Sequence, residues 1–225
     1  MFQVKICGVT NLEDALCCAE AGADAIGLNF YPPSPRCVRV DVARRIALGL
    51  PTTMTKVGVF VNASRDEMLR TCDQVGLDMI QLHGDETPPM MAELAGRRLL
   101  KAFRCSSDEL RPVAEFLQRC EDLGCRPSGV LIDAYQPNAF GGTGHTANWS
   151  LVRKLADLLL DIPIVLAGGL SPENVAAAIE ATRPAAVDTA SGVEAEPGRK
   201  DPQRVRAFTG NAWDAFRRMD SRSSS

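Results

Sequence analysis

Short apolar runs alternate with stretches of helical periodicity along almost the whole chain. The runs predict strands at residues 4–6, 25–29, 57–61, 79–83, 99–103, 130–133, 164–167 and 185–188. The periodic stretches predict helices at residues 12–21, 42–48, 65–75, 89–95, 108–123, 150–160, 172–182 and 202–219. Strands that alternate with helices indicate a parallel sheet, because each parallel connection crosses back along a helix.

The regular repeat also indicates the fold class. Eight strand–helix repeats in 225 residues are typical of a closed (β/α)8 barrel, whereas a doubly wound sheet rarely needs so many even repeats. No linker, low-complexity stretch or charge run divides the chain, so we expect one α/β domain over residues 1–219. Residues 220–225 are polar and mostly small, and we expect them to form a disordered tail.

Three of the predicted helices have start signals, and the first of them follows Asn11, with Asp14 in its first turn. Ser171 stands at an N-cap position before Pro172, and Asp201 stands in the same way before Pro202. Ser and Asp side chains accept hydrogen bonds from the first free N–H groups of a helix, and proline suits the first helical position. We therefore expect the last two helices to begin at these prolines.

Alternation within the strands separates a branched apolar face from a polar face. The apolar face should pack on the helices, and it comprises Val4, Ile6, Ile26, Leu28, Ile80, Leu82, Val130, Ile132 and Val187. The other face should line the barrel interior, and it comprises Lys5, Cys7, Asn29, Gln81, His83, Lys101, Asp133 and Asp188. Active sites of this fold lie at the C-terminal ends of the strands, so Cys7 and Asp133 are placed for chemistry.

Composition and charge narrow the function classes. Hydrophobic residues make up 45% of the chain, charged residues 24%, and the net charge is −3, so nothing indicates binding to nucleic acid or to a membrane. No segment approaches ~20 apolar residues and no signal peptide is recognisable, so we expect a cytoplasmic protein. The eight cysteines include no CxxC pair and no Cys/His cluster with zinc spacing, so we expect free thiols and no metal.

Seven segments of the chain carry a family resemblance. They are KICG at 5–8, GLNFYPPSPRCV at 27–38, QLHGDE at 81–86, LIDA at 131–134, FGGTGHTANW at 140–149, LAGGLSPENV at 166–175 and DTASGVEAEPGRKD at 188–201. In this order, over residues 3–208, they resemble the phosphoribosylanthranilate isomerase family. Single pieces such as GGTG occur in many phosphate-binding barrels, but the whole series is specific.

The resemblance implies a cofactor-free (β/α)8 barrel of tryptophan biosynthesis. The implied reaction is an Amadori rearrangement, which converts N-(5-phosphoribosyl)anthranilate into 1-(2-carboxyphenylamino)-1-deoxyribulose 5-phosphate. The resemblance assigns the general base to Cys7 and the general acid to Asp133. A nearby cation such as Lys5 would favour the thiolate, and burial or a negative charge would have to raise the pKa of Asp133.

Both ends of such a substrate need a binding site. We expect the phosphate at the loops after the seventh and eighth strands, which contain Gly168, Gly169, Ser191 and Gly192. Ala190 departs from the family, which commonly has a serine there, so a backbone amide would remain but a hydroxyl would not. The loop after the sixth strand, with Gly142 and Gly144, is expected to close over the site.

The other candidate residues surround the same site. Arg36 matches the anthranilate-binding arginine of the family, and a guanidinium suits a planar carboxylate. His83 is expected to position the site rather than to transfer protons. Asp188 should orient the eighth loop or pair with Lys5. The chain also has Asn29 where the family usually has an apolar residue.

Two other functions remain open at this point. A histidine-pathway isomerase that runs the same rearrangement on another amine would share the phosphate loops, but such enzymes tend to use two aspartates, and Cys7 argues against this. A barrel that binds a phosphorylated metabolite without turnover is the second alternative, and the presence of Cys7, Asp133 and Arg36 argues against it. In either case we expect a phosphorylated small-molecule ligand and a monomer or homodimer.

Overall fold

The strands form a closed barrel in a computed structural model, which describes residues 1–104, 111–133, 149–159 and 161–223. The eight parallel strands follow one another around the ring in chain order, and β1 pairs with both β2 and β8. Their bounds are β1 (Val4–Cys7), β2 (Ala25–Asn29), β3 (Thr55–Phe60), β4 (Met79–Leu82), β5 (Leu99–Arg104), β6 (Gly129–Asp133), β7 (Ile164–Ala167) and β8 (Ala186–Thr189). The predicted fold class is confirmed.

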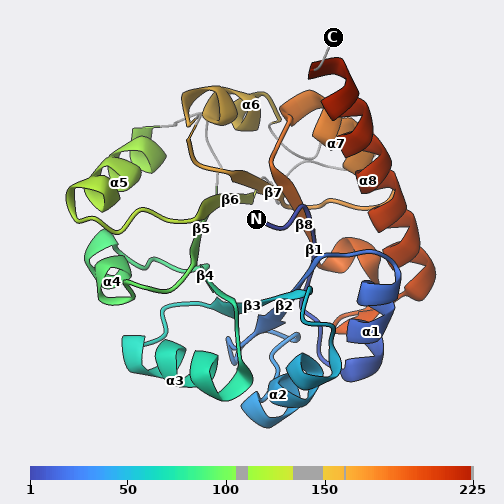
Figure 1. The fold of residues 1–225 in the computed structure, drawn as a ribbon, viewed down its shortest axis with the longest axis horizontal. Helices are drawn as coiled ribbons and strands as arrows, with labels where there is room; N and C mark the ends of the chain where they lie inside the picture. The colour runs from blue at the N-terminus through green and yellow to red at the C-terminus, as the bar shows by residue number, and fades with distance from the viewer. Residues whose placement is uncertain (105–110, 134–148, 160, 224–225) are drawn as a thin grey trace.

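An outer ring of helices surrounds the strands (Figure 1). Their bounds are α1 (Leu12–Glu20), α2 (Val40–Gly49), α3 (Arg65–Val75), α4 (Pro88–Glu93), α5 (Arg111–Asp122), α6 (Trp149–Leu158), α7 (Val175–Thr182) and α8 (Pro202–Ser223). Between β8 and α8 the chain adds the 3-10 turn η1 (Ser191–Val193) and a hairpin of β9 (Glu194–Glu196) and β10 (Arg199–Lys200). Sequence periodicity did not predict this hairpin, because its two strands are too short to show an alternation.

The start of α7 differs from the prediction. The helix begins at Val175 and not at Pro172, because Ser171 takes part in a turn instead of capping the helix. The Ser171 N–H donates to Asn174 Oδ1 at 2.8 Å, and the Asn174 and Val175 N–H groups both donate to the Ser171 carbonyl. An asparagine side chain that closes a turn on a nearby N–H competes in this way with helix formation.

The predicted start of α8 is confirmed, whereas its end lies further along the chain. Asp201 Oδ1 accepts from the N–H groups of Gln203 and Arg204, as an N-cap should. The helix continues to Ser223, so residues 220–223 are helical where we expected a disordered tail. Residues 224 and 225 lie outside the described part of the chain.

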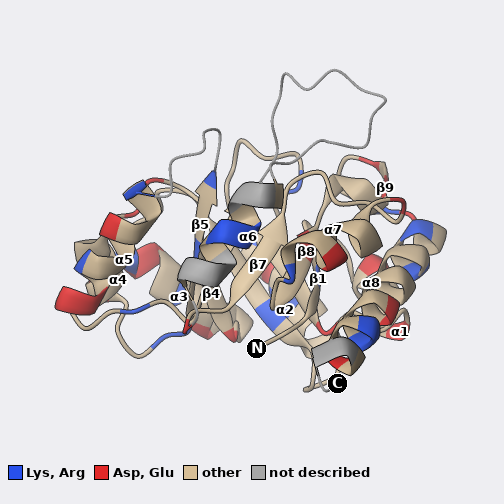
Figure 2. Cartoon of the chain, turned by 90° about the horizontal axis from the view of Figure 1, so that it is seen from above, with Lys and Arg blue, Asp and Glu red and all other residues tan. Residues whose placement is uncertain are grey.

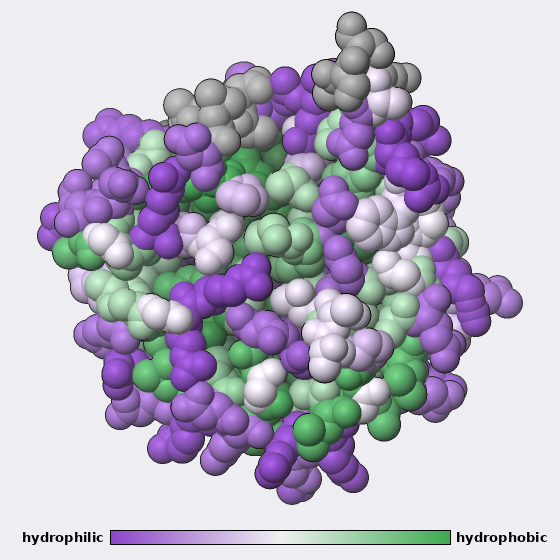
Figure 3. Space-filling model, in the orientation of Figure 1, coloured by the Kyte–Doolittle hydropathy of each residue, from purple (hydrophilic) through white to green (hydrophobic). Residues whose placement is uncertain are grey.

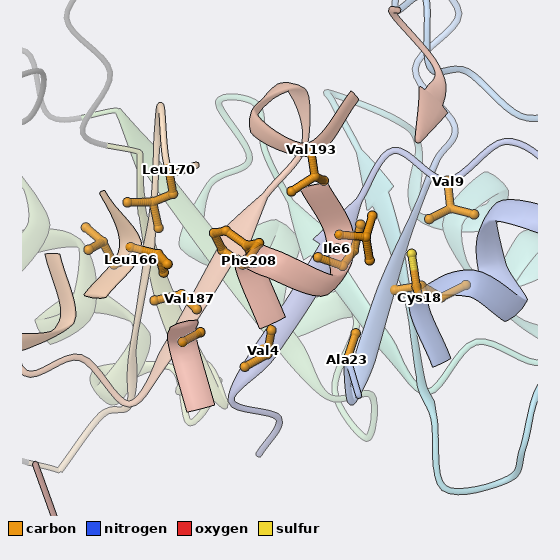
Figure 4. Packing of buried hydrophobic residues seen from close by; sticks show 14 of the residues in the cluster. Val4, Ile6, Val9, Cys18, Ala23, Leu166, Leu170, Val187, Val193 and Phe208 are labelled. Atoms are coloured by element: carbon orange, nitrogen blue, oxygen red, sulfur yellow. The ribbon is translucent and has the colours of Figure 1, made fainter. Parts of the chain in front are cut away.

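The apolar strand face packs on the helices as predicted. Val4 and Val187 are completely buried on neighbouring strands, and Phe208 of α8 packs against them from outside (Figure 4). Burial of one such side chain contributes about 1.5–3 kcal/mol. Apolar residues on the outer face of the strands explain why helices can cover the sheet.

The interior face is polar toward one end only. A separate apolar cluster fills the rest of the barrel, with Ala25, Val57, Met79, Leu100, Ala102, Leu131, Val165 and Ala186 among its members. Leu100 and Ala102 occupy the interior positions of β5, so the prediction that Lys101 faces inward is wrong. Lys101 pairs in register with Leu82 on the outer face, because neighbouring residues of a strand point to opposite sides.

Charged side chains cover the outside of the molecule. Figure 2 shows Lys, Arg, Asp and Glu mostly on the outer helices and loops. On the face that carries the N-terminus, hydrophilic side chains form most of the rim (Figure 3). Within the described residues, none of the helices combines the length and the apolar character that crossing a membrane requires.

Candidate active site

A cavity of about 550 Å³ opens at the carboxyl ends of the strands. Cys7, Asn29, Asp133 and Asp188 reach it from the ends of four different strands, and His83 reaches it from the residue after β4. The volume is within the range of small-molecule sites, and the position is the one that this fold uses for catalysis.

A buried ion pair lies beneath the cavity. The Lys5 Nζ donates to Asp188 Oδ1 at 2.8 Å, and the Lys5 side chain is completely buried. The expected pairing across β1 and β8 is therefore confirmed. Gly27 on β2 makes room for this arrangement, since a β-carbon there would lie 2.7 Å from the Cys7 sulfur and 3.1 Å from the Lys5 Nζ. Gly27 was not among the predicted site residues, although a glycine inside an apolar strand often marks a close approach of another chain segment.

Electrostatics couples the lysine to the thiol. Burial raises the pKa of Cys7, and the Lys5 ammonium opposes this without cancelling it. Burial also works against the charge on Lys5, but Asp188 and Cys7 outweigh it, so the pKa of Lys5 is raised. The lysine therefore stays charged at neutral pH and favours the Cys7 thiolate, as expected. Burial outweighs this effect, so the thiol is the prevailing form of Cys7 in the unliganded protein.

His83 stands between Gln81 and Asp133. Its Nδ1 lies 2.9 Å from Gln81 Nε2, and its Nε2 lies 4.0 Å from Asp133 Oδ2. Burial lowers the pKa of His83, and the negative charge of Asp133 opposes that shift only in part. A neutral imidazole that is held by an amide on one side suits the positioning role expected for His83.

Arg36 does not stand alone at the rim of the cavity. Its Nε and Nη2 donate to Glu194 at 2.8 and 2.6 Å, which forms a bidentate ion pair. Its aliphatic stem lies over Gly8, where a β-carbon would come within 2.4 Å of Arg36 Cδ. Local sequence patterns do not reveal the pairing with Glu194, because Glu194 is 158 positions away along the chain and only the folded hairpin brings it close.

Backbone groups of the loops after β7 and β8 form another part of the rim. Gly168 and Gly169 have φ angles of +91° and +69°, which glycine adopts without strain. They line the cavity together with Ala190 and Ser191. Gly192 lies behind this rim, where a β-carbon would come within 1.8 Å of the Leu170 carbonyl.

Two side chains fix carbonyl groups of the loop after β7. Asn174 Nδ2 donates to the Gly169 carbonyl at 2.9 Å, and Thr189 Oγ1 donates to the Leu170 carbonyl at 2.6 Å. Because the N–H of a trans peptide points opposite to its C=O, holding the Gly169 carbonyl back turns the Leu170 amide the other way, whereas the Ser171 N–H already donates to Asn174 Oδ1. Such loops are suited to binding an anion through the backbone.

Most of the predicted site residues meet in this one cavity. Those that line it are Cys7, Arg36, His83, Asp133, Gly168, Gly169, Asp188 and Ser191. Of the remaining predicted residues, Gly192 lies behind the rim and does not line the cavity, and Gly142 and Gly144 lie outside the described part of the chain. In the part that is described, no group of three or more His, Cys, Asp or Glu side chains is arranged to hold a metal ion.

Comparison with known proteins decides between the alternatives left open by the sequence. The model of the family described as N-(5'phosphoribosyl)anthranilate (PRA) isomerase matches residues 4–211. The chain belongs to this PRA isomerase family. A relative of that name from Azotobacter vinelandii is 50% identical over 204 residues, which cover 91% of this chain and 94% of the relative. Another from Trichlorobacter lovleyi is 46% identical over 217 residues, covering 96% of this chain and all of the relative.

Solved PRA isomerase structures agree with this assignment. The phosphoribosyl anthranilate isomerase of Thermotoga maritima has 42% identity and a TM-score of 0.83, and the alignment covers 95% of this chain and all of that one. A second PRA isomerase structure, with 40% identity, a TM-score of 0.81 and the same coverage, is a complex with reduced 1-(o-carboxyphenylamino)-1-deoxyribulose 5-phosphate. The chain is thus an isomerase of tryptophan biosynthesis, as its seven motifs predicted.

Proposed function

We propose that the chain converts N-(5'-phosphoribosyl)anthranilate into 1-(o-carboxyphenylamino)-1-deoxyribulose 5-phosphate, with Cys7 as general base and Asp133 as general acid. The observation that carries the assignment is that both residues end their strands on the wall of one cavity. A thiol and a carboxyl group on β1 and β6 can face the ribose of the substrate from two sides.

Ring opening is the first step. Asp133 gives its proton to the ring oxygen of the ribose while the bond from C1 to that oxygen breaks. The lone pair of the anthranilate nitrogen forms the C1–N double bond that replaces it. His83, with Nε2 4.0 Å from Asp133 Oδ2, lies beside the carboxyl group that makes this transfer.

Proton transfer at carbon is the second step. The Cys7 thiolate removes the proton from C2, and the electrons of that bond form an enolamine between C2 and C1. The thiol then returns a proton to C1, while the C2 hydroxyl proton restores Asp133, so that the product is an isomer of the substrate. Lys5 lowers the cost of the thiolate, because its pKa is raised and it remains charged.

Two grips would hold the ends of the substrate. Arg36 is placed to take the anthranilate carboxylate through the Nη1 edge that Glu194 does not occupy. The loops with Gly168, Gly169 and Ser191 are placed to take the phosphate through backbone amides, which remain available although Ala190 replaces a hydroxyl. Both grips leave the sugar over Cys7.

The test is a turnover assay that follows the fluorescence of the anthranilate substrate. We expect Cys7→Ser and Asp133→Asn each to lower kcat by about 10²–10⁴-fold, the usual contribution of a general acid or base. Cys37→Ser is the matched control, because Cys37 is an exposed free thiol outside the cavity. Unchanged turnover in either of the first two variants would remove that residue from the mechanism, and binding without turnover in the wild type would favour a binding protein.

A further inference from the structure

The hairpin between β8 and α8 contains two buried charges that the proposed reaction does not use. Glu194 and Lys200 are register partners on β9 and β10, and their side chains are 4% and 0% exposed. The Lys200 Nζ donates to Glu194 Oε1 at 3.0 Å. The hairpin lies at the end of the barrel away from the N-terminus (Figure 2), which is the end that carries the cavity.

Glu194 is held from three directions. Besides the Lys200 ammonium, it accepts both hydrogen bonds of the Arg36 fork and one from the Gly198 N–H at 3.3 Å. The hairpin turn is itself tied to the loop after β1, since Thr10 Oγ1 donates to the Gly198 carbonyl at 2.6 Å. Arg36 is therefore fixed both by its stem, over Gly8, and by its head.

Lys200 reaches the other rim of the cavity. Its Nζ also donates to the Ala190 carbonyl at 3.1 Å, and its backbone N–H donates to Asp14 Oδ2 at 2.9 Å. Lys200 does not line the cavity, whereas Ala190 and Ser191 do. Because a peptide N–H points opposite to its C=O, holding the Ala190 carbonyl toward the buried lysine turns the Ser191 N–H toward the cavity.

We propose that Glu194 and Lys200 are positioning residues that lock the two substrate grips to each other. Glu194 aims the Arg36 guanidinium at the aromatic carboxylate, and Lys200 aims the Ser191 amide at the phosphate. One buried pair thereby sets the distance between the two ends of a substrate that the cavity accepts. This arrangement of Glu194 and Lys200 would favour substrates that carry both a carboxylate and a phosphate at this spacing.

The charge balance explains why a lysine belongs here. An isolated Arg36–Glu194 pair is neutral and would attract a carboxylate only weakly. Adding Lys200 gives the three groups a net charge of +1, so the arginine keeps its attraction for an anion while its orientation is fixed. Burial works against the charge of Glu194, but Arg36 and Lys200 outweigh it and lower the pKa of Glu194.

The inference rests on the proposed function, because it needs Arg36 and the β8 loop to bind the two substrate ends. The experiment therefore measures the binding of each substrate end through the inhibition constant Ki of a competitive inhibitor. Anthranilate reports on the carboxylate grip, and ribose 5-phosphate reports on the phosphate grip. KM and kcat for the whole substrate are measured in the same variants. Glu196→Gln is the matched control, since it changes an exposed carboxylate on the same hairpin.

The two positions should give different patterns. We expect Glu194→Gln to raise KM and the Ki of anthranilate about tenfold, with the Ki of ribose 5-phosphate unchanged. Lys200→Met should raise both Ki values about tenfold. The double variant Glu194→Gln and Lys200→Met, which removes both buried charges, should fold even if the single lysine variant does not, and it should also raise both Ki values.

Other outcomes would overturn the inference. Equal effects of Glu194→Gln on the two inhibitors, or no effect of removing Lys200 on ribose 5-phosphate, would show that the pair only supports the fold. Arg36→Met separates this from a failure of the proposed function. If Arg36→Met raises the Ki of anthranilate and Glu194→Gln does not, the positioning role is wrong; if neither does, the carboxylate grip is wrong.

Discussion

Two buried lysine–carboxylate pairs with nearly the same geometry lie on opposite sides of the sheet. Lys5 and Asp188 are joined at 2.8 Å, Lys101 and Glu86 at 2.9 Å, and in each pair both side chains are at most 8% exposed. Lys5 points into the barrel, toward the cavity that Cys7 lines. Lys101 points outward, away from the interior cluster that contains its neighbours Leu100 and Ala102.

The surroundings give the two pairs different tasks. Lys5 faces a thiol and stabilises its charged form. Lys101 donates to the Gly84 carbonyl at 2.6 Å, while Glu86 accepts from the N–H groups of Asn62 and Gly84, so this pair holds two loops in place. The same ion pair can therefore tune a reactive group or support a loop, and the direction of one side chain on its strand decides which.

The largest expected effect concerns Lys101 and Glu86, the outer pair, and tests whether this pair contributes to stability without contributing to catalysis. Lys101→Met leaves the buried Glu86 carboxylate without its ammonium, which should lower the free energy of unfolding by about 3–5 kcal/mol. The kcat of the folded protein should change less than about twofold, because the variant does not alter the cavity that Cys7 lines. Urea unfolding and turnover measure the two quantities, and a large fall in kcat would show that the outer pair acts in catalysis.

Removing both charges of Lys5 and Asp188, the inner pair, should lower activity and leave stability nearly unchanged. In Lys5→Met with Asp188→Asn, kcat/KM should fall about 10²–10³-fold, because the proposed base loses its cation and the cavity wall loses the Asp188 carboxylate. The free energy of unfolding should change little, since removing both charges of a buried pair is often neutral. Lys101→Met with Glu86→Gln is the matched double variant, and the comparison fails if both doubles lose activity equally.

A smaller effect should follow from filling the space above the inner pair. Gly27→Ala puts a methyl group against the Cys7 sulfur and the Lys5 Nζ, so we expect kcat/KM to fall about tenfold and stability to fall by about 1–3 kcal/mol. Gly210→Ala is the control, because a β-carbon there meets nothing within 4 Å and the residue lies in α8. It should stabilise the helix by about 0.5–1 kcal/mol. Wild-type activity in Gly27→Ala would mean that Cys7 does not need its present position.

The smallest expected effect is a change in pH dependence. Burial raises the pKa of Cys7, and the proposed Cys7 base would act only when deprotonated, so kcat/KM should still increase with pH above ~8.5. Lys5→Met should move this rise to higher pH by about one pH unit, which corresponds to ~1.4 kcal/mol. Lys101→Met should leave it in place. A rise that ends below neutral pH would point to another base.

The barrel and most of the candidate site could be predicted from local patterns. Apolar alternation located the strands, and the position of Cys7 and Asp133 at strand ends led to the cavity. The prediction that Lys101 faces the interior was wrong, because a single polar residue does not show which face of β5 lies inside the barrel. Its apolar neighbours Leu100 and Ala102 do show it, because they belong to the interior cluster. Gly27 was missed because the need for a small residue depends on what the adjacent strand places over it.

The sequence by itself determined the repeated strands and helices, the family and the chemical types of the site residues, because periodicity and motifs are local properties of the chain. Only the tertiary structure decided which charges meet. Lys5 contacts Asp188 because the barrel closes by pairing β8 with β1. Arg36 contacts Glu194 because a short hairpin folds back over the rim of the cavity. Such contacts depend on strand register and ring closure, which no short stretch of sequence encodes.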